Sequence, residues 1–596
     1  MGRCVTLGLA MLMGLAASSA RAAEPAAALP ALAYVPKDAV AFVHIPNLKT
    51  LQAELQRFTT ETGWQVAKTG MPVTDQIVRR TGLSAGLDWD APAALAYLDP
   101  KQYPNRYTVY VLPVADWDAL LKAAKAEPMT ADIYALTATG GPCFLLKSGR
   151  FAVVTSSVRT LKDVRGATGI VGSLASDTRA RAVAAAGPMI YVDIHRLVVV
   201  YQKDIAAWLK ASSGQVISMP QVVPYSDIMT TYILGIADLL DQIETLEGTF
   251  QFGPEGLSSD LSVRFVDKAS LANFLTAQAP GAIAPPPVGD FPITSCVSVQ
   301  LDPKSRTDIV MRVVAYFLEK APRPQPLQEP TKEHVTQAVE TLAKSLGPQM
   351  VMISASASMG MGLETDVTIL DLQSPDDFKR GVSLFAAAWG ELAEEMDLYA
   401  GIHAMPDASE IAGVPVSLYM PRFRFGVNPQ QSRFTEGLKA LYGPEGLAYR
   451  IAVVGQKAVI ATGSDLALFK KVVENLKAGQ APVPPSVAQL QGRMPPKLNL
   501  WAMSSPPMFL RGAFLAGGTP PERVGEVNPG KELAGFGLAA DGPSIRINSY
   551  LPHEQLRLAK ELLDRVSPEL SKKTESLFEP TREEPPAPGP KAKGAE

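Results

Sequence analysis

The sequence predicts an α+β protein made of two tandem duplicated domains, each a largely antiparallel sheet with amphipathic helices on one face. Strand-like segments with apolar residues at every second position recur between prolines and glycines. Paired strands with a glycine between them indicate hairpins, and helical segments follow many of the strands. These elements appear in the same order twice, which is the reason for predicting a duplication.

The first strand and helix lie in the segment AYVPKDAVAFVHIPNLKTLQAEL, residues 33–55. Val40, Phe42 and Ile45 have the apolar character of a buried strand, and a proline lies on either side of it. The leucines that follow recur at spacings of three and four, namely Leu48, Leu51 and Leu55. We therefore expect a core strand followed by a helix that packs on the sheet.

This opening recurs without a gap in the segment FPITSCVSVQLDPKSRT, and looser copies begin at Gly187 and Pro495. The alignment places Val299 on Val43 and Gln300 on His44. Because the second copy has a glutamine there, the strand does not depend on an imidazole. We expect His44 to be structural and to lie at the rim of the fold, where glutamine would cost little stability.

Two further elements are repeated. The hairpins Cys143–Thr155 and Tyr449–Thr462 have the glycine-containing turns SGR and GQK. A strand that runs into a helix occurs four times, at residues 107–126, 261–278, 367–385 and 545–563. Serine is expected to cap two helices, as Ser374 before Pro375 and as Ser464 before DLALFKKVVENL.

These elements predict the following organisation of the chain: a signal peptide at 1–22, a first α+β domain at 31–279, a proline-rich linker at 280–289, a second α+β domain at 290–568 and a disordered proline-rich tail at 579–596. The second domain carries a proline-rich insertion near 320–331.

The first residues have the order of an export signal. Arg3 precedes an apolar run, and Ala20 and Ala22 form the small-residue pair after which cleavage is expected. Cys4 precedes the apolar run, so we expect no lipid attachment there. No later stretch reaches about 18 uninterrupted apolar residues, the usual length of a membrane helix. The sequence thus predicts a periplasmic or secreted protein without a transmembrane helix in its mature chain.

Composition excludes one class of partner. The chain has 596 residues and a formal net charge of −3, which gives no global attraction to nucleic acid or anionic lipid. After export two cysteines remain, Cys143 and Cys296, both in apolar stretches. We expect both to be buried thiols. An oxidising compartment would also permit a disulfide between them, which remains the alternative.

The opening YVPKDAVAFVHIP, the strands GRFAVVTSS and QKAVIATGS with their following helices, and the tandem layout resemble an uncharacterised family of exported bacterial proteins. Members of this domain-of-unknown-function family repeat a tyrosine-x-proline opening before a valine-rich strand. The resemblance would cover nearly the whole mature chain. It implies an extracytoplasmic location, and it brings no catalytic residue to this sequence.

Catalytic motifs are absent from the sequence. The five histidines are His44, His195, His334, His403 and His553. Asp193 lies two residues before His195 on the expected strand, but a structural histidine is the preferred interpretation. His553 and Glu554 are not followed by a second histidine, because Arg557 stands in that place, so the zinc-protease pattern is incomplete. We assign no catalytic, cofactor-binding or metal-ligating residue and expect no cofactor.

Two Asp-Trp-Asp segments, 88–90 and 116–118, could place acids beside an aromatic platform, as in a glycosidase. Acids at helix starts explain both segments more simply, because they cap free amides and complement the helix dipole. The sequence therefore favours a non-catalytic binding or envelope-assembly module whose partner is an unknown protein or an apolar ligand. A carrier of an apolar ligand such as a lipid is the alternative, and a hydrolase on carbohydrate or peptide is the weakest one.

Overall fold

A computed structural model gives the structure of the protein. It describes residues 29–64, 72–103, 107–138, 141–166, 169–184, 187–217, 239–320, 326–358, 361–395, 399–423, 438–439, 442–479, 482–516 and 519–568. The predicted signal peptide, its cleavage site, the predicted tail and residues 321–325 of the predicted insertion lie outside the described residues.

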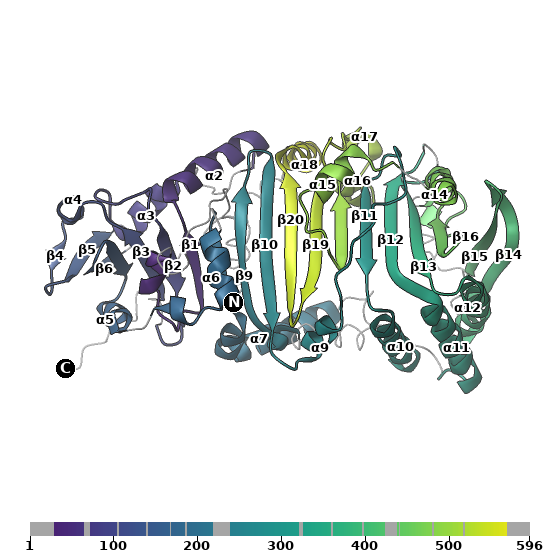
Figure 1. Cartoon of the computed structure of the whole chain (residues 1–596), viewed down its shortest axis with the longest axis horizontal. Helices are drawn as coiled ribbons and strands as arrows, with labels where there is room; N and C mark the ends of the chain where they lie inside the picture. Colours follow the sequence, from purple (N-terminus) through teal and green to yellow (C-terminus); the bar gives the residue numbers. More distant parts are fainter. Residues whose placement is uncertain are drawn as a thin grey trace, which may run out of the picture.

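One continuous antiparallel sheet of 20 strands runs the length of the molecule (Figure 1). From one end to the other, the pairings give the order β4-β5-β6-β7-β3-β2-β1-β8-β9-β10-β20-β19-β18-β11-β12-β13-β17-β16-β15-β14. The α+β class with a largely antiparallel sheet is confirmed. The expectation of a separate sheet in each domain is wrong, because β10 and β20 pair and join the two halves.

The strands of the first half are β1 (Ala41–Ile45), β2 (Ala93–Tyr97), β3 (Thr108–Pro113), β4 (Glu127–Pro128), β5 (Ile133–Ala138), β6 (Gly141–Ser148), β7 (Phe151–Thr155), β8 (Met189–Asp193), β9 (Ile243–Phe252) and β10 (Gly256–Phe265). Those of the second half are β11 (Ser295–Gln300), β12 (Leu346–Ser356), β13 (Glu364–Leu372), β14 (Tyr399–Ile411), β15 (Val414–Phe423), β16 (Tyr449–Val454), β17 (Lys457–Thr462), β18 (Leu500–Ser504), β19 (Ala534–Asp541) and β20 (Ser544–Pro552).

The helices of the first half are α2 (Leu48–Thr62), α3 (Val73–Thr81), α4 (Trp117–Ala123), α5 (Val158–Gly166), α6 (Ser176–Ala184), α7 (Ile194–Ile217) and α9 (Ser270–Thr276). Those of the second half are α10 (Pro303–Lys320), α11 (Glu329–Ser345), α12 (Pro375–Glu395), α14 (Ala467–Ala478), α15 (Pro485–Gln491), α16 (Pro506–Ala516), α17 (Pro521–Val524) and α18 (His553–Val566). Short 3-10 helices, η1 (Pro30–Tyr34) and η2 (Ile170–Gly172), complete the first half.

The two halves have the same strand order. Counted outward from the β10–β20 pair, the first half reads 10-9-8-1-2-3-7 and the second reads 20-19-18-11-12-13-17. One row of cross-strand partners also runs through both halves: Val43, Ile190, Gly248, Leu261, Ile547, Leu538, Leu500 and Val299. Val43 and Val299, matched by sequence, thus lie at equivalent distances from the join. Both observations support the duplication, and superposition of the halves stays a prediction.

The join between the halves is a regular antiparallel pair with its own side-chain contacts. Ser259 and Ser549 face each other across it, with their hydroxyl oxygens 2.7 Å apart. Next to them, Arg546 donates two hydrogen bonds to the carboxylate of Asp260, which makes a bidentate ion pair between the neighbouring strands. Away from the sheet, His553 of α18 pairs with Glu61 of α2. Backbone and side chains therefore both connect the two halves.

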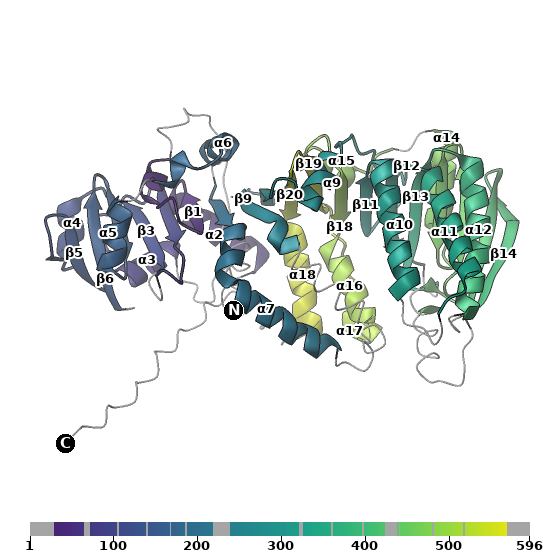
Figure 2. The ribbon, with the colours of Figure 1, turned by 90° about the horizontal axis from the view of Figure 1, so that it is seen from below.

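Helices cover both faces of the sheet, which corrects the expectation that they would lie on one face. Residues of α2 and α4 form a core with Val43 and Ile45 on what we call the α2 face. On the opposite face, the α14 face, Phe42 packs in a core that includes residues of α5 and α6, and α14 and α15 cover the second half. Figure 2 shows α14 and α15 on one side of the sheet and α16 and α18 on the other. Every residue of β7 is buried, because both of its faces are covered.

The predicted linker is packed against the second half. Val288 is fully buried and Ile283 packs beside it in the core under α14 and α15. Gly281 exchanges backbone hydrogen bonds with Leu498, just before β18. Its composition predicted a linker, but its backbone and apolar residues have partners in the fold.

The predicted serine caps have different outcomes. The Ser374 hydroxyl accepts a hydrogen bond from the Asp377 amide at 3.2 Å, as expected for the start of α12. Ser464 does not cap α14, so this prediction is wrong. Instead Asp465 accepts from the Ala467 amide at 2.9 Å, while the Ser464 hydroxyl accepts from the Glu445 amide at 3.1 Å. The carboxylate is one residue closer to the helix start and is the stronger acceptor.

Replacing the glycine of either repeated hairpin turn by alanine is expected to lower the free energy of unfolding by about 1 kcal/mol. Gly149 and Gly455 have nearly equal left-handed φ angles, +56° and +57°. A residue with a Cβ atom is strained in this conformation, so alanine is unfavourable in both turns. Urea unfolding of Gly149→Ala and Gly455→Ala would measure this. Asparagine at the same positions should cost less, and an alanine variant as stable as the wild type would contradict the prediction.

The sheet ends in two different outer strands. At the end of the first half, β4 has two residues and finishes at Pro128. At the other end, β14 contains Pro406, and its register with β15 shifts between Met405 and Ser409.

Candidate functional site

The histidines lie in separate elements: His44 in β1, His195 in α7, His334 in α11, His403 in β14 and His553 in α18. His334 pairs with Glu391 across α11 and α12 at 2.8 Å. His553 is buried, pairs with Glu61 and lies edge-on to the ring of Phe58. Within the described part of the chain, no three His, Cys, Asp or Glu side chains are grouped as metal ligands.

His44 lies in the core and not at the rim, which corrects the sequence-based expectation about its exposure. It is 2% exposed, and neither ring nitrogen has a hydrogen-bond partner among the described residues. Burial lowers its pKa from 6.5 to about 4. The imidazole is therefore neutral at neutral pH and packs as an uncharged side chain.

Asp193 and His195 do not lie on one strand, which corrects the expected placement. β8 ends at Asp193, and His195 lies in the first turn of α7. The Asp193 carboxylate accepts a hydrogen bond from the Arg196 amide at 2.8 Å, which caps the helix. The sequence did not show that the strand ends at this acid.

The other flagged residues have local structural roles. Asp116 accepts from the amides of Asp118 and Ala119 at 2.9 and 3.0 Å and caps α4, as predicted. Asp88 accepts from the Asp90 amide at 3.2 Å, in a turn. Cys143 is half-buried and Cys296 is buried, and both are free thiols.

A strip of apolar side chains on the α2 face is left half-exposed in the second half. It crosses the four adjacent strands β12, β11, β18 and β19 in two rows of cross-strand partners. We call it the middle strip; its members are Val297, Val299, Met350, Met352, Leu500, Ala502, Phe536 and Leu538. Met352 is 40% exposed and Phe536 is 39% exposed, which is unusual for side chains in the interior of a sheet.

The same surface is buried in the first half. Phe250 on β9 and Phe536 on β19 lie in one row of cross-strand partners, each on the strand next to the joining pair β10 and β20. Phe250 is 6% exposed, against 39% for Phe536. Apolar residues of α2 cover the first-half surface, among them Leu51 and Leu55. The bare strip is thus a property of the second half alone.

The helix in the position of α2 does not cover the middle strip. Leu318 of α10 packs with α11 and α12 in a separate helical core, and Val314 and Phe317 pack beside it. On its outer side, Ile309 and Val313 are 43% and 61% exposed. Where α10 meets the strip, a hollow of about 50 Å³ remains between Arg306 and the strand residues.

The opposite end of the strip is polar. Glu364 and Asp366 point to the α2 face from β13, and Ser354 donates to the Asp366 carboxylate at 2.6 Å. Burial raises the pKa of both carboxyl groups, and the Asp366 charge raises that of Glu364 further. Gly512 of α16 lies against Glu364: a Cβ atom at position 512 would be 3.1 Å from a carboxylate oxygen of Glu364, so a larger side chain would require Glu364 to shift. An apolar surface with a hydrogen-bonding end can bind an amphiphilic molecule or an apolar partner segment.

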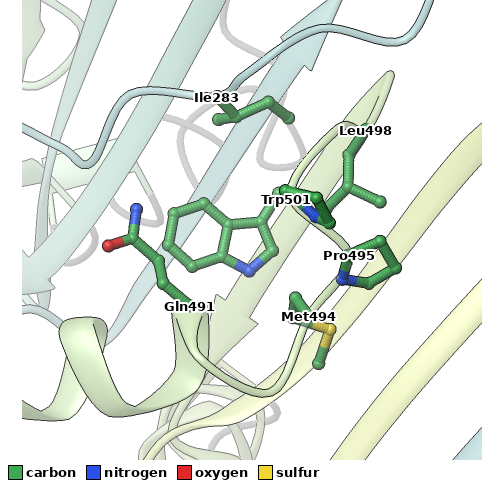
Figure 3. A pocket seen from close by; sticks show the side chains of 7 residues that line it. Ile283, Gln491, Met494, Pro495, Leu498 and Trp501 are labelled. Carbon is green, nitrogen blue, oxygen red and sulfur yellow. The ribbon is translucent and has the colours of Figure 1, made fainter.

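A pocket of about 90 Å³ lies on the other face of the sheet, around Trp501 of β18 (Figure 3). Its lining comes from the linker, from the loop between α15 and β18 and from β18: Ile283, Gln491, Met494, Pro495, Pro496, Leu498 and Trp501. The sheet separates this pocket from the middle strip.

Comparison with known proteins identifies no family. No family model matches the sequence, and no curated protein matches it. Among solved structures, crystal form I of TP0453 is similar with a TM-score of 0.22 and 9% identity over 41% of this chain and 80% of that chain. Crystal form III of TP0453 gives a TM-score of 0.22 and 8% identity over 46% and 97%. A likeness of this size carries no functional argument, so the function must be argued from the site.

In the described ranges, no helix is both long and apolar enough to span a membrane.

Proposed function

We propose that this is a non-catalytic, extracytoplasmic binding protein whose middle strip binds an apolar ligand, such as the acyl chain of a lipid. The observation that carries the proposal is the half-exposure of eight apolar side chains in contiguous rows, at a place where the other half of the chain is covered. Water contact of such a surface is unfavourable, and full burial of a large exposed side chain is worth about 1.5–3 kcal/mol. Met352 and Phe536 are about 40% exposed, so a ligand that covers the strip gains a fraction of that free energy from each side chain.

The polar end of the strip can contribute to binding. Asp366 is held by Ser354, and Glu364 lies beside it at the end of the strip, where they can receive hydrogen bonds from a ligand head group. On α16, the helix that follows β18, Phe509 is 72% exposed. An apolar protein segment is the alternative ligand, which corresponds to the envelope-assembly hypothesis.

A Met352→Gln/Phe536→Asn double variant is expected to bind a dansyl-labelled fatty acid at least tenfold more weakly than the wild type. Both side chains are already partly exposed, so the change removes contact area at about 1.4 kcal/mol or more without a large loss of stability. Fluorescence titration of the purified mature protein measures the affinity. Native mass spectrometry of the same sample identifies a co-purifying lipid or protein.

Met129→Gln is the matched control, because Met129 is 51% exposed in the first half, away from the strip. Its affinity should equal that of the wild type. Equal affinity of the double variant, or equal loss in the control, would refute the middle strip as the binding surface. A co-purifying polypeptide without lipid would favour the protein-partner alternative.

A further inference from the structure

The polar end of the middle strip begins with a row of serines. Two rows of apolar side chains make up the strip, and serine occupies most positions of the next row on the same face. The members of this row are Ser354 on β12, Ser295 on β11, Ser504 on β18 and Ala534 on β19. All are partly exposed, and Asp366 on β13 continues the row as the partner of Ser354. The surface therefore changes from apolar to polar in one direction, as an amphiphilic molecule does.

The two carboxyl groups at this end can be reached by a ligand. Glu364 and Asp366 are both partly exposed, and neither forms an ion pair with another described residue. Ser354 donates to Asp366, whereas no described residue donates a hydrogen bond to Glu364. The oxygens of Glu364 are not among the buried polar atoms, so they keep contact with solvent.

The neighbouring positive charge does not compensate these acids. Burial and, to a smaller degree, the charge of Asp366 raise the pKa of Glu364, and the opposing effect of Arg511 on α16 is smaller than both. Burial raises the pKa of Asp366 more than the Ser354 hydrogen bond lowers it. A further positive charge beside the two carboxylates would stabilise both of them in the ionised form.

The head group that fits this end is a primary ammonium. Ionised carboxylates only accept hydrogen bonds, so the ligand must supply the donors. An ammonium has three N–H donors and a positive charge, and hydrogen bonds between ionised groups are roughly twice as strong as neutral ones. A hydroxyl offers one donor without a charge, and the acids would repel a carboxylate or phosphate head group.

We infer that the middle strip selects amphiphiles with a primary ammonium head group on an alkyl or acyl chain. The chain lies over the apolar rows, and the ammonium donates to Glu364 and Asp366 beside the serine row. Neighbouring strands lie about 4.8 Å apart, so the four strands of the strip span about 14 Å, which suits a chain of medium length. This inference rests on the proposed function of the middle strip and adds the charge and donor chemistry of its ligand.

Three dodecyl compounds with different head groups test the inference: dodecylamine, dodecanol and dodecanoate. Each competes with the dansyl-labelled fatty acid for the purified mature protein at pH 7.5, below its micelle concentration. Dodecylamine should displace the probe at a concentration at least about tenfold lower than dodecanoate, and dodecanol should lie between them. The chains are matched, so the difference reports the head group.

A Glu364→Gln/Asp366→Asn double variant should lose this preference, so that dodecylamine and dodecanoate displace the probe at similar concentrations. The amides keep the shape of the acids, and burial already disfavours the charges that are removed. The melting temperature should therefore not fall. The affinity for the dansyl-labelled fatty acid should be equal or higher, because its carboxylate is no longer repelled.

Asp118→Asn/Glu127→Gln is the matched control, because both acids are exposed in the first half. It removes the same number of charges and should keep the wild-type preference for the amine. Met352→Gln/Phe536→Asn should bind dodecylamine more weakly than the wild type, since the chain loses contacts with the strip.

Equal displacement by dodecylamine and dodecanoate in the wild type would overturn the inference, and so would an unchanged preference in Glu364→Gln/Asp366→Asn. The strip would then remain an apolar site without head-group selection. An unchanged dodecylamine affinity in Met352→Gln/Phe536→Asn would also overturn it, because the amine would be bound elsewhere. If neither the dansyl-labelled fatty acid nor any dodecyl compound binds the wild type, the proposed function itself fails, and the inference fails with it.

Discussion

Acidification from neutral pH to pH 4 is expected to lower the free energy of unfolding by about 3 kcal/mol through His44 alone. The folded-state pKa is about 4, below the value of 6.5 for a solvated histidine, because burial disfavours the charged ring. The unfolded chain therefore takes up a proton first. This contribution to stability is fully present above about pH 6.5 and is lost as the pH falls toward 4.

His44→Leu should remove this dependence. Neither ring nitrogen has a hydrogen-bond partner among the described residues, so leucine loses no bond, removes unpaired buried polar atoms and should be at least as stable as the wild type at pH 7.5. Urea unfolding across the pH range gives both values. His195→Leu, on an exposed position of α7, is the control and should keep the wild-type slope. Equal slopes for wild type and His44→Leu would show that His44 is not the group responsible.

Val43→Asp is expected to lower the free energy of unfolding by at least about 4 kcal/mol, whereas Val299→Asp should cost roughly 1–2 kcal/mol. The two valines hold equivalent places in one row of the sheet. Val43 is 3% exposed under α2, so a carboxylate there is buried without a partner. Val299 belongs to the middle strip and is half-exposed, so water can reach a carboxylate at that position.

Urea unfolding of the two variants at pH 7.5 measures the difference. If Val43→Asp does not fold, the threonine pair replaces it, because Val→Thr buries only a hydroxyl. Val43→Thr should then cost about 1–3 kcal/mol and Val299→Thr less than about 1 kcal/mol. Equal costs at both positions would contradict the difference in covering between the halves.

Local patterns in the sequence were enough to predict most elements of the fold. Alternating apolar residues and glycine turns located the repeated hairpins, and the ungapped match of Val43 to Val299 agrees with their places in the sheet. The join of β10 to β20 could not be predicted, because strand pairing between distant segments leaves no periodic signal. The burial of His44 was also missed, since its counterpart Gln300 is only half-buried.

The candidate site was harder to predict than the fold. Every strand of the middle strip alternates apolar residues as a core strand does, so the sequence does not distinguish a covered face from a bare one. A signal was present in α10, where Ile309 and Val313 lie one turn apart on the side away from its helical core. The matching positions of α2 are Ala53 and Arg57. This difference between copies could have indicated an apolar surface left open in the second half.

The two outer strands of the sheet, β4 and β14, disfavour pairing with a strand of another molecule. Any sheet edge with free amides and carbonyls is a template for another chain, and β10 and β20 show that edges of this fold do pair. At the outer ends, Pro128 and Pro406 lack the donor that an added strand needs, and the shifted register of β14 disrupts a flat edge. These features oppose end-to-end addition of molecules into a fibril.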